Sequence, residues 1–471
     1  MARLCGRKVN VVHAAPPHYG RLAGAAAAAI AAVMANQQPP ALPPPLPRRE
    51  FAVLFAVLLT VAAGNTALQT VLPGIARVIH IPDMAVAVIF SFSALLWTFS
   101  APYWARQSDV RGRRRLMQLG VVGFMVSMLG CGIAIHAGLM GWLLPMATFA
   151  LFAGLRSLFG IFGSASNPAA QAYVAARTNE AQRTGALASL SSAFGLGTII
   201  GPAVAPLFII APLGLAGPMF AFAAIAAVVL VGVSRWLPDD DPTHFASRGA
   251  PSSEPSVAGG ATGATVTAAA AGRPPRLSWR DPRILPFMIF GFVSGSIQAA
   301  TGQALGFLVI DTLGGNALDA QQEIAIIFMA GAGATLIAQW GLIPQLQLTP
   351  PSLLRWGTAV AALGTAGIAL APDFHAQVVA FALMSLGYGL ARPGFTAGAS
   401  LAVGRAEQGG VAGAVTAVNG SCFVLAPAIG IGLYTIGHTL TYWLGAAALA
   451  ALFVYALRSA PLGQEPVAHE D

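Results

Sequence analysis

The sequence is poor in charged residues. Only 9% of its 471 residues are Asp, Glu, Lys or Arg, whereas an average soluble protein has about 25%. The hydrophobic fraction is 56% and the mean hydropathy is +0.71. A soluble fold of this length needs a charged surface that this chain cannot supply, which excludes soluble enzymes, nucleic-acid-binding modules and disordered scaffolds. The composition is typical of a polytopic membrane protein.

Cysteine is scarce as well. Cys5, Cys131 and Cys422 lie far apart, so neither a disulfide framework nor a metal site is predicted, and we expect no cofactor. No Walker-type Lys-Ser/Thr loop is present, so ATP-driven transport is not encoded. The triplet Asp239-Asp240-Asp241 has no second acidic motif to help it hold a metal-bound diphosphate, and Pro242 follows it. We therefore interpret the triplet as a solvated charge run and not as part of an intramembrane enzyme.

Long apolar segments are abundant. A helix crosses the bilayer core with about 20 apolar residues, and such segments recur six times on each side of a polar stretch. The sequence predicts an all-α membrane protein with twelve transmembrane helices in two six-helix, pseudo-symmetric bundles. The predicted spans are Phe51–Pro73, Met84–Trp104, Leu116–His136, Leu143–Ala172, Arg183–Ile209, Pro218–Trp236, Ile284–Ile310, Ile324–Trp340, Trp356–Ala371, Gln377–Val403, Gly410–Gly432 and Leu440–Leu457.

The basic residues test this topology independently. With a cytoplasmic N-terminus, 22 of the 25 Lys and Arg fall in cytoplasmic segments or at the cytoplasmic ends of spans, only Arg77 lies outside, and Arg156 and Arg392 fall deep within spans. Lys and Arg accumulate in cytoplasmic loops. The distribution therefore predicts a multi-pass protein of a bacterial-type cell (inner) membrane with both termini cytoplasmic. It also explains the net charge of +8 without a nucleic-acid partner.

The predicted organisation has five parts. The first is an N-terminal extension rich in Ala and Pro, interpreted either as a disordered tail or as the product of an over-long reading frame whose start is Met34. The central polar stretch is rich in Ala, Gly, Ser, Thr and Pro and indicates a flexible cytoplasmic linker. The predicted parts are extension 1–50, first bundle 51–236, linker 237–283, second bundle 284–458 and cytoplasmic tail 459–471.

The two halves share Gly and Pro positions at a constant offset of 225 residues. The matching pairs are Pro168 and Pro393, Gly185 and Gly410, Gly195 and Gly420, and Pro202 and Pro427. Two parallel six-helix repeats indicate a transporter whose halves rock around a site near the middle of the membrane.

Three motifs follow one another in the first half. The loop after the second span reads Ala105-Arg-Gln-Ser-Asp109-Val-Arg111-Gly112-Arg113-Arg114-Arg115, in which Gly112 permits a tight turn. The fourth span carries Arg156 and Gly160, and an Arg inside a span is a functional candidate by default. The fifth span carries Gly197, Gly201 and Pro202, where small residues permit close helix packing and Pro interrupts the backbone ladder. The alternatives are a plain positive-inside loop, an Arg tied to backbone carbonyls and nonspecific packing.

In these spans and this order, the motifs resemble those of the major facilitator superfamily, in particular its twelve-span drug:proton antiporter branch of tetracycline and multidrug exporters. The resemblance covers roughly Phe51 to Leu457. It implies that Asp109, Gly112, Arg113 and Arg114 form a cytoplasmic latch and that Arg156 acts near substrate or proton coupling. It also implies that Gly201-Pro202 belongs to an antiporter motif. The chain departs from the family pattern at Ala105, Val110, Phe159 and Ala205.

Polar residues within apolar spans are candidates for a substrate cavity, with hydrogen bonding between helices as the alternative. Arg392 is either an anion-binding group or a structural charge near the cytoplasmic mouth. Candidates for an apolar wall, with simple packing or lipid contact as the alternative, are Trp97, Phe92, Phe159, Met384 and Tyr388. The predicted cavity residues are Asn65, Gln69, Trp97, Gln298, Gln303, Tyr388, Arg392 and Asn419, with Thr66, Ser294 and Thr301 as further polar positions.

Proton-coupled carriers use a titrating carboxylate, but no Asp or Glu lies near the middle of any predicted span. Asp311 and Glu323, at the outer ends of the seventh and eighth spans, are the proton-coupling candidates. The alternative is that the substrate itself carries the charge.

The sequence thus predicts a monomeric secondary transporter that exports a small amphipathic molecule by alternating access, coupled to protons. The alternative is a carrier of one metabolite, such as a sugar, a siderophore or a biosynthetic product, without proton coupling. A channel or a receptor is disfavoured, because neither needs a two-half repeat with a latch loop. The expected partners are the substrate, protons and the lipid bilayer.

Overall fold

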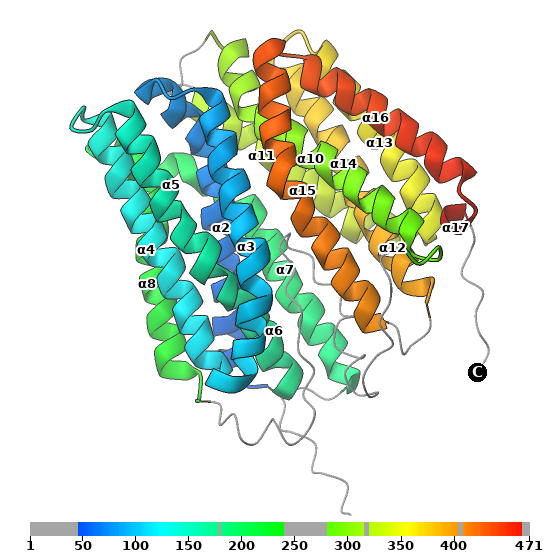
Figure 1. Cartoon of the computed structure of the whole chain (residues 1–471), viewed down its shortest axis with the longest axis horizontal. Coiled ribbons are helices and arrows are strands. Elements are labelled where there is room, and N and C mark those ends of the chain that lie inside the picture. The colour runs from blue at the N-terminus through cyan, green and yellow to red at the C-terminus, as the bar shows by residue number, and fades with distance from the viewer. Residues whose placement is uncertain (1–45, 178–179, 240–279, 315–319, 404–407, 464–471) are drawn as a thin grey trace, which may run out of the picture. The chain divides into compact units, whose positions relative to one another are not determined.

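A computed structural model describes residues 46–177, 180–239, 280–314, 320–403 and 408–463. Within these ranges every regular element is helical (Figure 1). Most of the predicted extension, of the linker and of the tail lies outside the described residues, and α2 begins at Arg48, within the predicted extension. The main helices are α2 (Arg48–Ile79), α3 (Asp83–Arg111), α4 (Arg113–Leu139), α5 (Pro145–Phe162), α6 (Ser166–Arg177), α7 (Glu180–Val204), α8 (Gly217–Trp236), α10 (Leu285–Thr312), α11 (Ala320–Leu336), α12 (Ile343–Leu346), α13 (Pro350–Leu370), α14 (Phe374–Leu401), α15 (Gln408–Ile436), α16 (Leu440–Arg458) and α17 (Ala460–Gly463).

Short non-α segments join some of these helices. They are η1 (Gly163–Ala165), η2 (Ala205–Phe208), η3 (Gly214–Ala216) and the π-helical η6 (Ile337–Leu342). The predicted fourth span therefore runs through α5, η1 and α6, and the predicted eighth span continues from α11 into the π turn.

Eleven helical segments of the described chain are long and apolar enough to cross a membrane. They correspond to eleven of the twelve predicted spans. The predicted span Arg183–Ile209 falls on α7, where the apolar stretch is the shorter segment Ser192–Phe208. The membrane class is thus supported, and the twelfth span stays a prediction.

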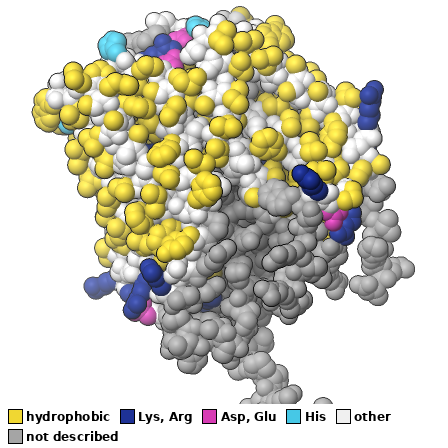
Figure 2. Space-filling view, in the orientation of Figure 1, with side chains coloured by type: hydrophobic (Ala, Val, Ile, Leu, Met, Phe, Trp, Pro, Cys, Tyr) yellow, Lys and Arg dark blue, Asp and Glu magenta, His cyan; other side chains and the backbone are white. Residues whose placement is uncertain are grey.

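The surface seen in Figure 2 is largely apolar, and its charged side chains gather toward the helix ends. Large hydrophobic side chains such as Phe99, Trp142, Leu144 and Val228 are more than 70% exposed. A continuous apolar surface of this kind is poorly solvated by water and matches the hydrocarbon core of a bilayer.

Helix packing in the first half has counterparts in the second. α7 packs along α2, and α15 packs along α10; α4 contacts α5 and α8, and α13 contacts α14 and α16. The two sets of helices meet where α3 contacts α15 and where α7 contacts α11. If the two halves are exchanged, α3 corresponds to α11 and α15 to α7, so the first contact becomes the second. The Gly and Pro offset of 225 residues indicates the same correspondence.

Gly112 makes the turn between α3 and α4. Its φ is +89°, a backbone conformation that residues with a Cβ rarely adopt. One helix therefore ends and the next begins within a single residue, as the loop motif predicts.

Replacing Gly112 with alanine is expected to lower the free energy of unfolding by about 1–3 kcal/mol, the usual cost of a strained backbone conformation. The measurement is the thermal unfolding midpoint of the detergent-solubilised protein, followed by tryptophan fluorescence. Gly154→Ala is the matched control, because Gly154 is an exposed helical residue of α5 with no atom within 4 Å of an added Cβ. Equal midpoints for both variants would contradict the expectation.

Candidate binding cavity

A cavity of about 430 Å³ lies between the two sets of helices, a size that suits a small organic molecule. Its walls come from α2, α3, α5 and α7 of the first half. In the second half they come from α10, α11 with the π turn, α14 and α15. Seven aromatic residues line it: Phe90, Trp97, Phe159, Phe194, Phe328, Phe381 and Phe423.

Six of the eight predicted cavity residues line this space. Asn65 and Gln69 share one face of α2 with Thr66, as their spacing predicts, and Gln298 and Gln303 come from α10. Trp97, Phe159 and Met384 contribute the predicted apolar wall. Arg156 and Arg392 both line the cavity, so Arg392 lies at this site and not only at a cytoplasmic mouth.

The remaining candidates lie elsewhere. Tyr388 is buried on α14, and its hydroxyl has no hydrogen-bond partner within the described chain, but it is not among the lining residues. Asn419 lies one turn nearer the start of α15 than the lining residue Phe423 and is not itself among the lining residues. Phe92 is 47% exposed on the outer surface. Ser294 and Thr301 donate to carbonyls of their own helix, α10.

Sequence reasoning missed several polar lining residues: Ser93, Thr198, Thr335, Gln339 and Ser385. Gln339 comes from the π turn of residues 337–342, and such turns shift the side-chain register and often occur at functional sites. An amide inside the apolar span Ile324–Trp340 was the available signal for Gln339. The other four are small hydroxyl residues, which occur throughout membrane helices.

Arg156 is the most deeply buried charge of the cavity, with 2% of its surface exposed. Its Nη2 donates to Oδ1 of Asn65, and its guanidinium lies 4.4 Å from the centroid of the Phe159 ring. Its Nε and Nη1 have no hydrogen-bond partner within the described chain. Gly160 lets α5 approach α3, because an added Cβ would lie 2.8 Å from the carbonyl oxygen of Ser93. Arg156 therefore links α5 to α2 at the cavity wall, and Gly160 permits the close contact of α5 with α3.

The residues of the predicted latch lie where α3 ends and α4 begins. Arg113 is 3% exposed, and Arg114 Nη1 pairs with Asp239 Oδ1 at 2.8 Å and donates from Nη2 to the carbonyl of Ser234. Asp239 is therefore paired, and not only a solvated charge as expected. Asp109 belongs to the last turn of α3, and its side chain lies outside the described part of the structure.

The predicted antiporter motif packs against the first helix. An added Cβ on Gly197 would lie 2.6 Å from the carbonyl oxygen of Leu59, and one on Gly201 would overlap the carbonyl oxygen of Ala63. α7 continues through Pro202 to Val204, where η2 begins. The two glycines bring α7 and α2 together along one wall of the cavity.

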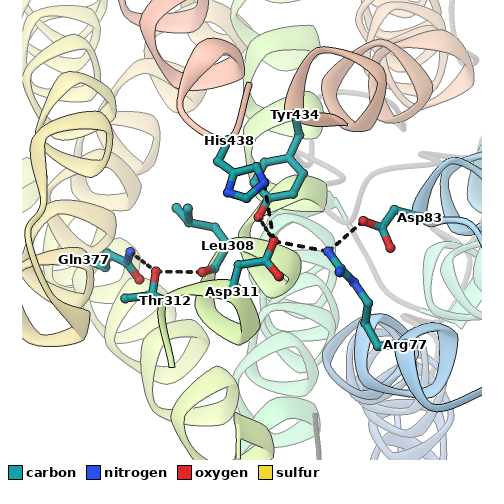
Figure 3. A network of polar contacts seen from close by, with 8 residues as sticks. All are labelled: Arg77, Asp83, Leu308, Asp311, Thr312, Gln377, Tyr434 and His438. Carbon is teal, nitrogen blue, oxygen red and sulfur yellow. Dashed lines mark hydrogen bonds and ion pairs between the residues drawn. The ribbon is translucent and has the colours of Figure 1, made fainter. Parts of the chain in front are cut away.

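Asp311 is the centre of a polar network at the opposite end of the helices (Figure 3). Arg77 Nη2 of α2 lies 3.1 Å from Asp311 Oδ2 and 2.8 Å from Asp83 Oδ2 of α3. The Tyr434 hydroxyl of α15 donates to Asp311, and His438 Nε2 lies 4.0 Å from the same oxygen. This network joins α2 and α3 of the first half to α10 and α15 of the second.

Glu323, the other proton-coupling candidate, does not belong to this network. It lies in the first turn of α11, half-buried, and its Oε2 has no hydrogen-bond partner within the described residues. The Asp311 network instead has a neighbouring contact to α14, because Thr312, the residue after Asp311, accepts a hydrogen bond from Gln377 Nε2 at 2.8 Å. Neither proton candidate is among the lining residues of the cavity.

Known proteins resemble this chain in sequence and in fold. Multidrug resistance protein 2 of Bacillus subtilis (strain 168) is 26% identical over 181 residues, 38% of this chain and 42% of that relative. The chain thus matches less than half of the length of this curated relative. The human organic anion transporter MFSD10 (TETRAN) has 18% identity over 87% of this chain and 100% of its own, with a TM-score of 0.60. A POT family transporter in complex with a thioalcohol-conjugated peptide has 16% identity over 88% of this chain and 97% of its own, with a TM-score of 0.63.

These likenesses to solved structures concern the fold alone, because the identities are low. The family match is broader: residues 54–427 match the Major Facilitator Superfamily. This range contains all three motifs of the first half, the cavity and Asp311. The chain therefore belongs to the major facilitator superfamily of transporters.

Proposed function

We propose that the protein exports a small amphipathic molecule by alternating access of its cavity. The observation that carries this proposal is the composition of the cavity wall. Helices of both halves line it, and it combines seven aromatic rings with amide and guanidinium groups. Such a wall binds an apolar body and orients a few polar groups. The partial likeness to a multidrug resistance protein supports export as the direction.

The proposed scaffold has twelve transmembrane helices in bundles 51–236 and 284–458, with both termini cytoplasmic. The proposal counts α7 with η2 as the fifth span. The neighbour relations of the helices support it, because each of α2, α3, α5 and α7 has a counterpart among the cavity-lining helices of the second half. Rocking of the two halves would then expose the cavity to each side in turn.

The Asp311 network is proposed as the outer closure of this cycle. Arg77 of the first half pairs with Asp311 and Tyr434 of the second half. Breaking such a link leaves partly buried polar groups without partners, at a cost of about 1–3 kcal/mol. This energy is sufficient to hold one conformation until a ligand or proton intervenes. The cluster of Asp109, Gly112, Arg113 and Arg114 is proposed as the corresponding latch on the cytoplasmic side.

Asp311 is also the proposed proton-coupling residue, with Glu323 as the second candidate. A proton on Asp311 would remove the charge that Arg77 and the Tyr434 hydroxyl bind, and so release the outer closure. None of the described residues that line the cavity is an Asp or a Glu, so coupling would act through the closure and not through the cargo site.

A dedicated carrier of one metabolite is the second candidate. The amides of Gln298, Gln303 and Gln339 favour it. A substrate that cannot form hydrogen bonds with these amides leaves them unpaired, and this lowers its affinity relative to that of the correct substrate.

The test uses inverted membrane vesicles with an acidic interior and a panel of drugs and metabolites. We expect added substrate to collapse the pH gradient saturably, and vesicles without the protein are the control. Collapse by several unrelated compounds would indicate a multidrug exporter, and collapse by one compound a dedicated carrier. Saturable uptake without collapse would refute proton coupling, and no saturable movement of any compound would refute the transport proposal.

A further inference from the structure

The charge of the cavity points to the class of its cargo, and here the inference rests on the proposed transport function. We infer that the cavity binds an amphipathic organic anion, with Arg156 as the principal recognition group. Two arginines line the cavity, and no carboxylate does among the described lining residues. The described wall therefore presents guanidinium groups and no carboxylate to a ligand.

Arg156 carries most of this argument. A guanidinium that is 2% exposed and has no carboxylate partner within the described chain is costly at the depth of a membrane helix. Asn65 satisfies only one of its nitrogens, and the ring of Phe159 covers one face. The unpaired Nε and Nη1 leave donors that a carboxylate or phosphate group would accept in the bidentate manner typical of arginine.

Arg392 supplies a second positive charge to the same cavity from α14, in the other half of the molecule. The aromatic residues of the same cavity suit a body that is apolar, not a small inorganic ion. An organic cation would meet two guanidinium groups and no counter-charge on the described wall. The wall thus favours an anion with an apolar body over an organic cation.

Asn65 is the residue that keeps the site cationic. Its Oδ1 already accepts from Arg156, so an aspartate there would place a carboxylate against the guanidinium with almost no change of shape. Asn65→Asp is therefore a sharper test than removal of Arg156, because it offsets the charge of the Arg156 guanidinium and does not leave a cavity.

The experiment measures ligand-induced thermal stabilisation of the purified full-length protein. The probes are matched triads of aromatic compounds, each comprising a carboxylate, its neutral methyl ester and its amine analogue, with inorganic phosphate as a simple anion. We expect carboxylates to stabilise the wild type more than their esters or amines do. Asn65→Asp and Arg156→Gln should each weaken carboxylate binding at least tenfold, and Arg392→Gln should weaken it less.

Arg458→Gln is the matched control, because Arg458 is an exposed arginine at the end of α16, away from the cavity. It should leave carboxylate binding unchanged. The inference is overturned if no carboxylate exceeds its ester, if the amines stabilise best, or if Asn65→Asp binds carboxylates as tightly as the wild type. Stabilisation by phosphate alone would also overturn it, since it would indicate a site for inorganic anions.

Counterflow in proteoliposomes separates this inference from the transport proposal. Saturable counterflow of the amines without the carboxylates would leave transport standing and refute the anion site. Tight carboxylate binding without counterflow of any probe would support the anion site and refute transport.

Discussion

Replacing Asp311 with asparagine is expected to abolish proton-driven accumulation of substrate while counterflow exchange continues. Arg77 and Tyr434 both bind the carboxylate, and an asparagine carries no charge and takes up no proton. The closure between the two halves would then be weak in every state and insensitive to pH. Transport down the substrate's own gradient needs only rocking of the halves. Accumulation against that gradient also needs each transport cycle to be coupled to the movement of a proton.

The same change should expose the cavity at the Arg77 end. Loss of a partly buried ionic partner costs about 1–3 kcal/mol, and 1.4 kcal/mol is tenfold in an equilibrium. We therefore expect labelling of Gln303→Cys by an impermeant maleimide to become roughly tenfold faster from that side. The background for this measurement would lack the native cysteines.

Two other carboxylates give the controls. Glu323→Gln tests the second proton candidate, and loss of accumulation in that variant alone would transfer the proton role to Glu323. Asp281 lies in the turn before α10, outside the membrane segments, where hydrogen bonds from Arg283 hold the pKa of its carboxyl below the usual range. It stays ionised at the assay pH, so Asp281→Asn should change neither readout. Normal accumulation by Asp311→Asn would contradict the proposed coupling.

The overall helical plan could be predicted from the sequence because it follows from local composition. An apolar run of about 20 residues has few alternatives to a membrane helix, and eleven such runs correspond to suitable helices. The fifth run was harder to assign, because α7 begins with polar residues from Glu180 and its apolar stretch is short. The cavity face of α2 was also predictable, since Asn65, Thr66 and Gln69 are polar at helical spacing in an apolar helix.

Contacts between distant helices could not be predicted in the same way. The sequence identified Asp311 as a helix-end carboxylate, but nothing local indicates that Arg77 and Tyr434 meet it from two other helices. Asn419 shows the same limit, because a polar residue in an apolar span need not line the cavity, and Asn419 is not among the lining residues. The position of Gln339 depends on a π turn, whose altered register no simple 3.6-residue pattern shows.

Gly201→Ala is expected to lower both the stability of the protein and its transport. An added Cβ at Gly201 would overlap the carbonyl oxygen of Ala63 and the hydroxyl of Thr66. Backbone atoms cannot rotate away as a flexible side chain can, so α7 must move from α2. Overpacking of this kind costs about 1–3 kcal/mol, and the shift would also displace Thr198 and Ile199, which line the cavity.

We therefore expect Gly201→Ala to lower the thermal unfolding midpoint and to reduce substrate counterflow at least tenfold. Gly195→Ala is the matched control in the same helix, because an added Cβ there meets no atom within 4 Å although Gly195 also borders the cavity. It should keep its stability, since alanine is favoured over glycine in a helix by about 1 kcal/mol. Equal stability and counterflow in the two variants would show that the contact between α7 and α2 is looser than the structure has it. Loss of counterflow in Gly201→Ala with an unchanged midpoint would instead assign the glycine to the motion of the halves and not to the packing of α7 against α2.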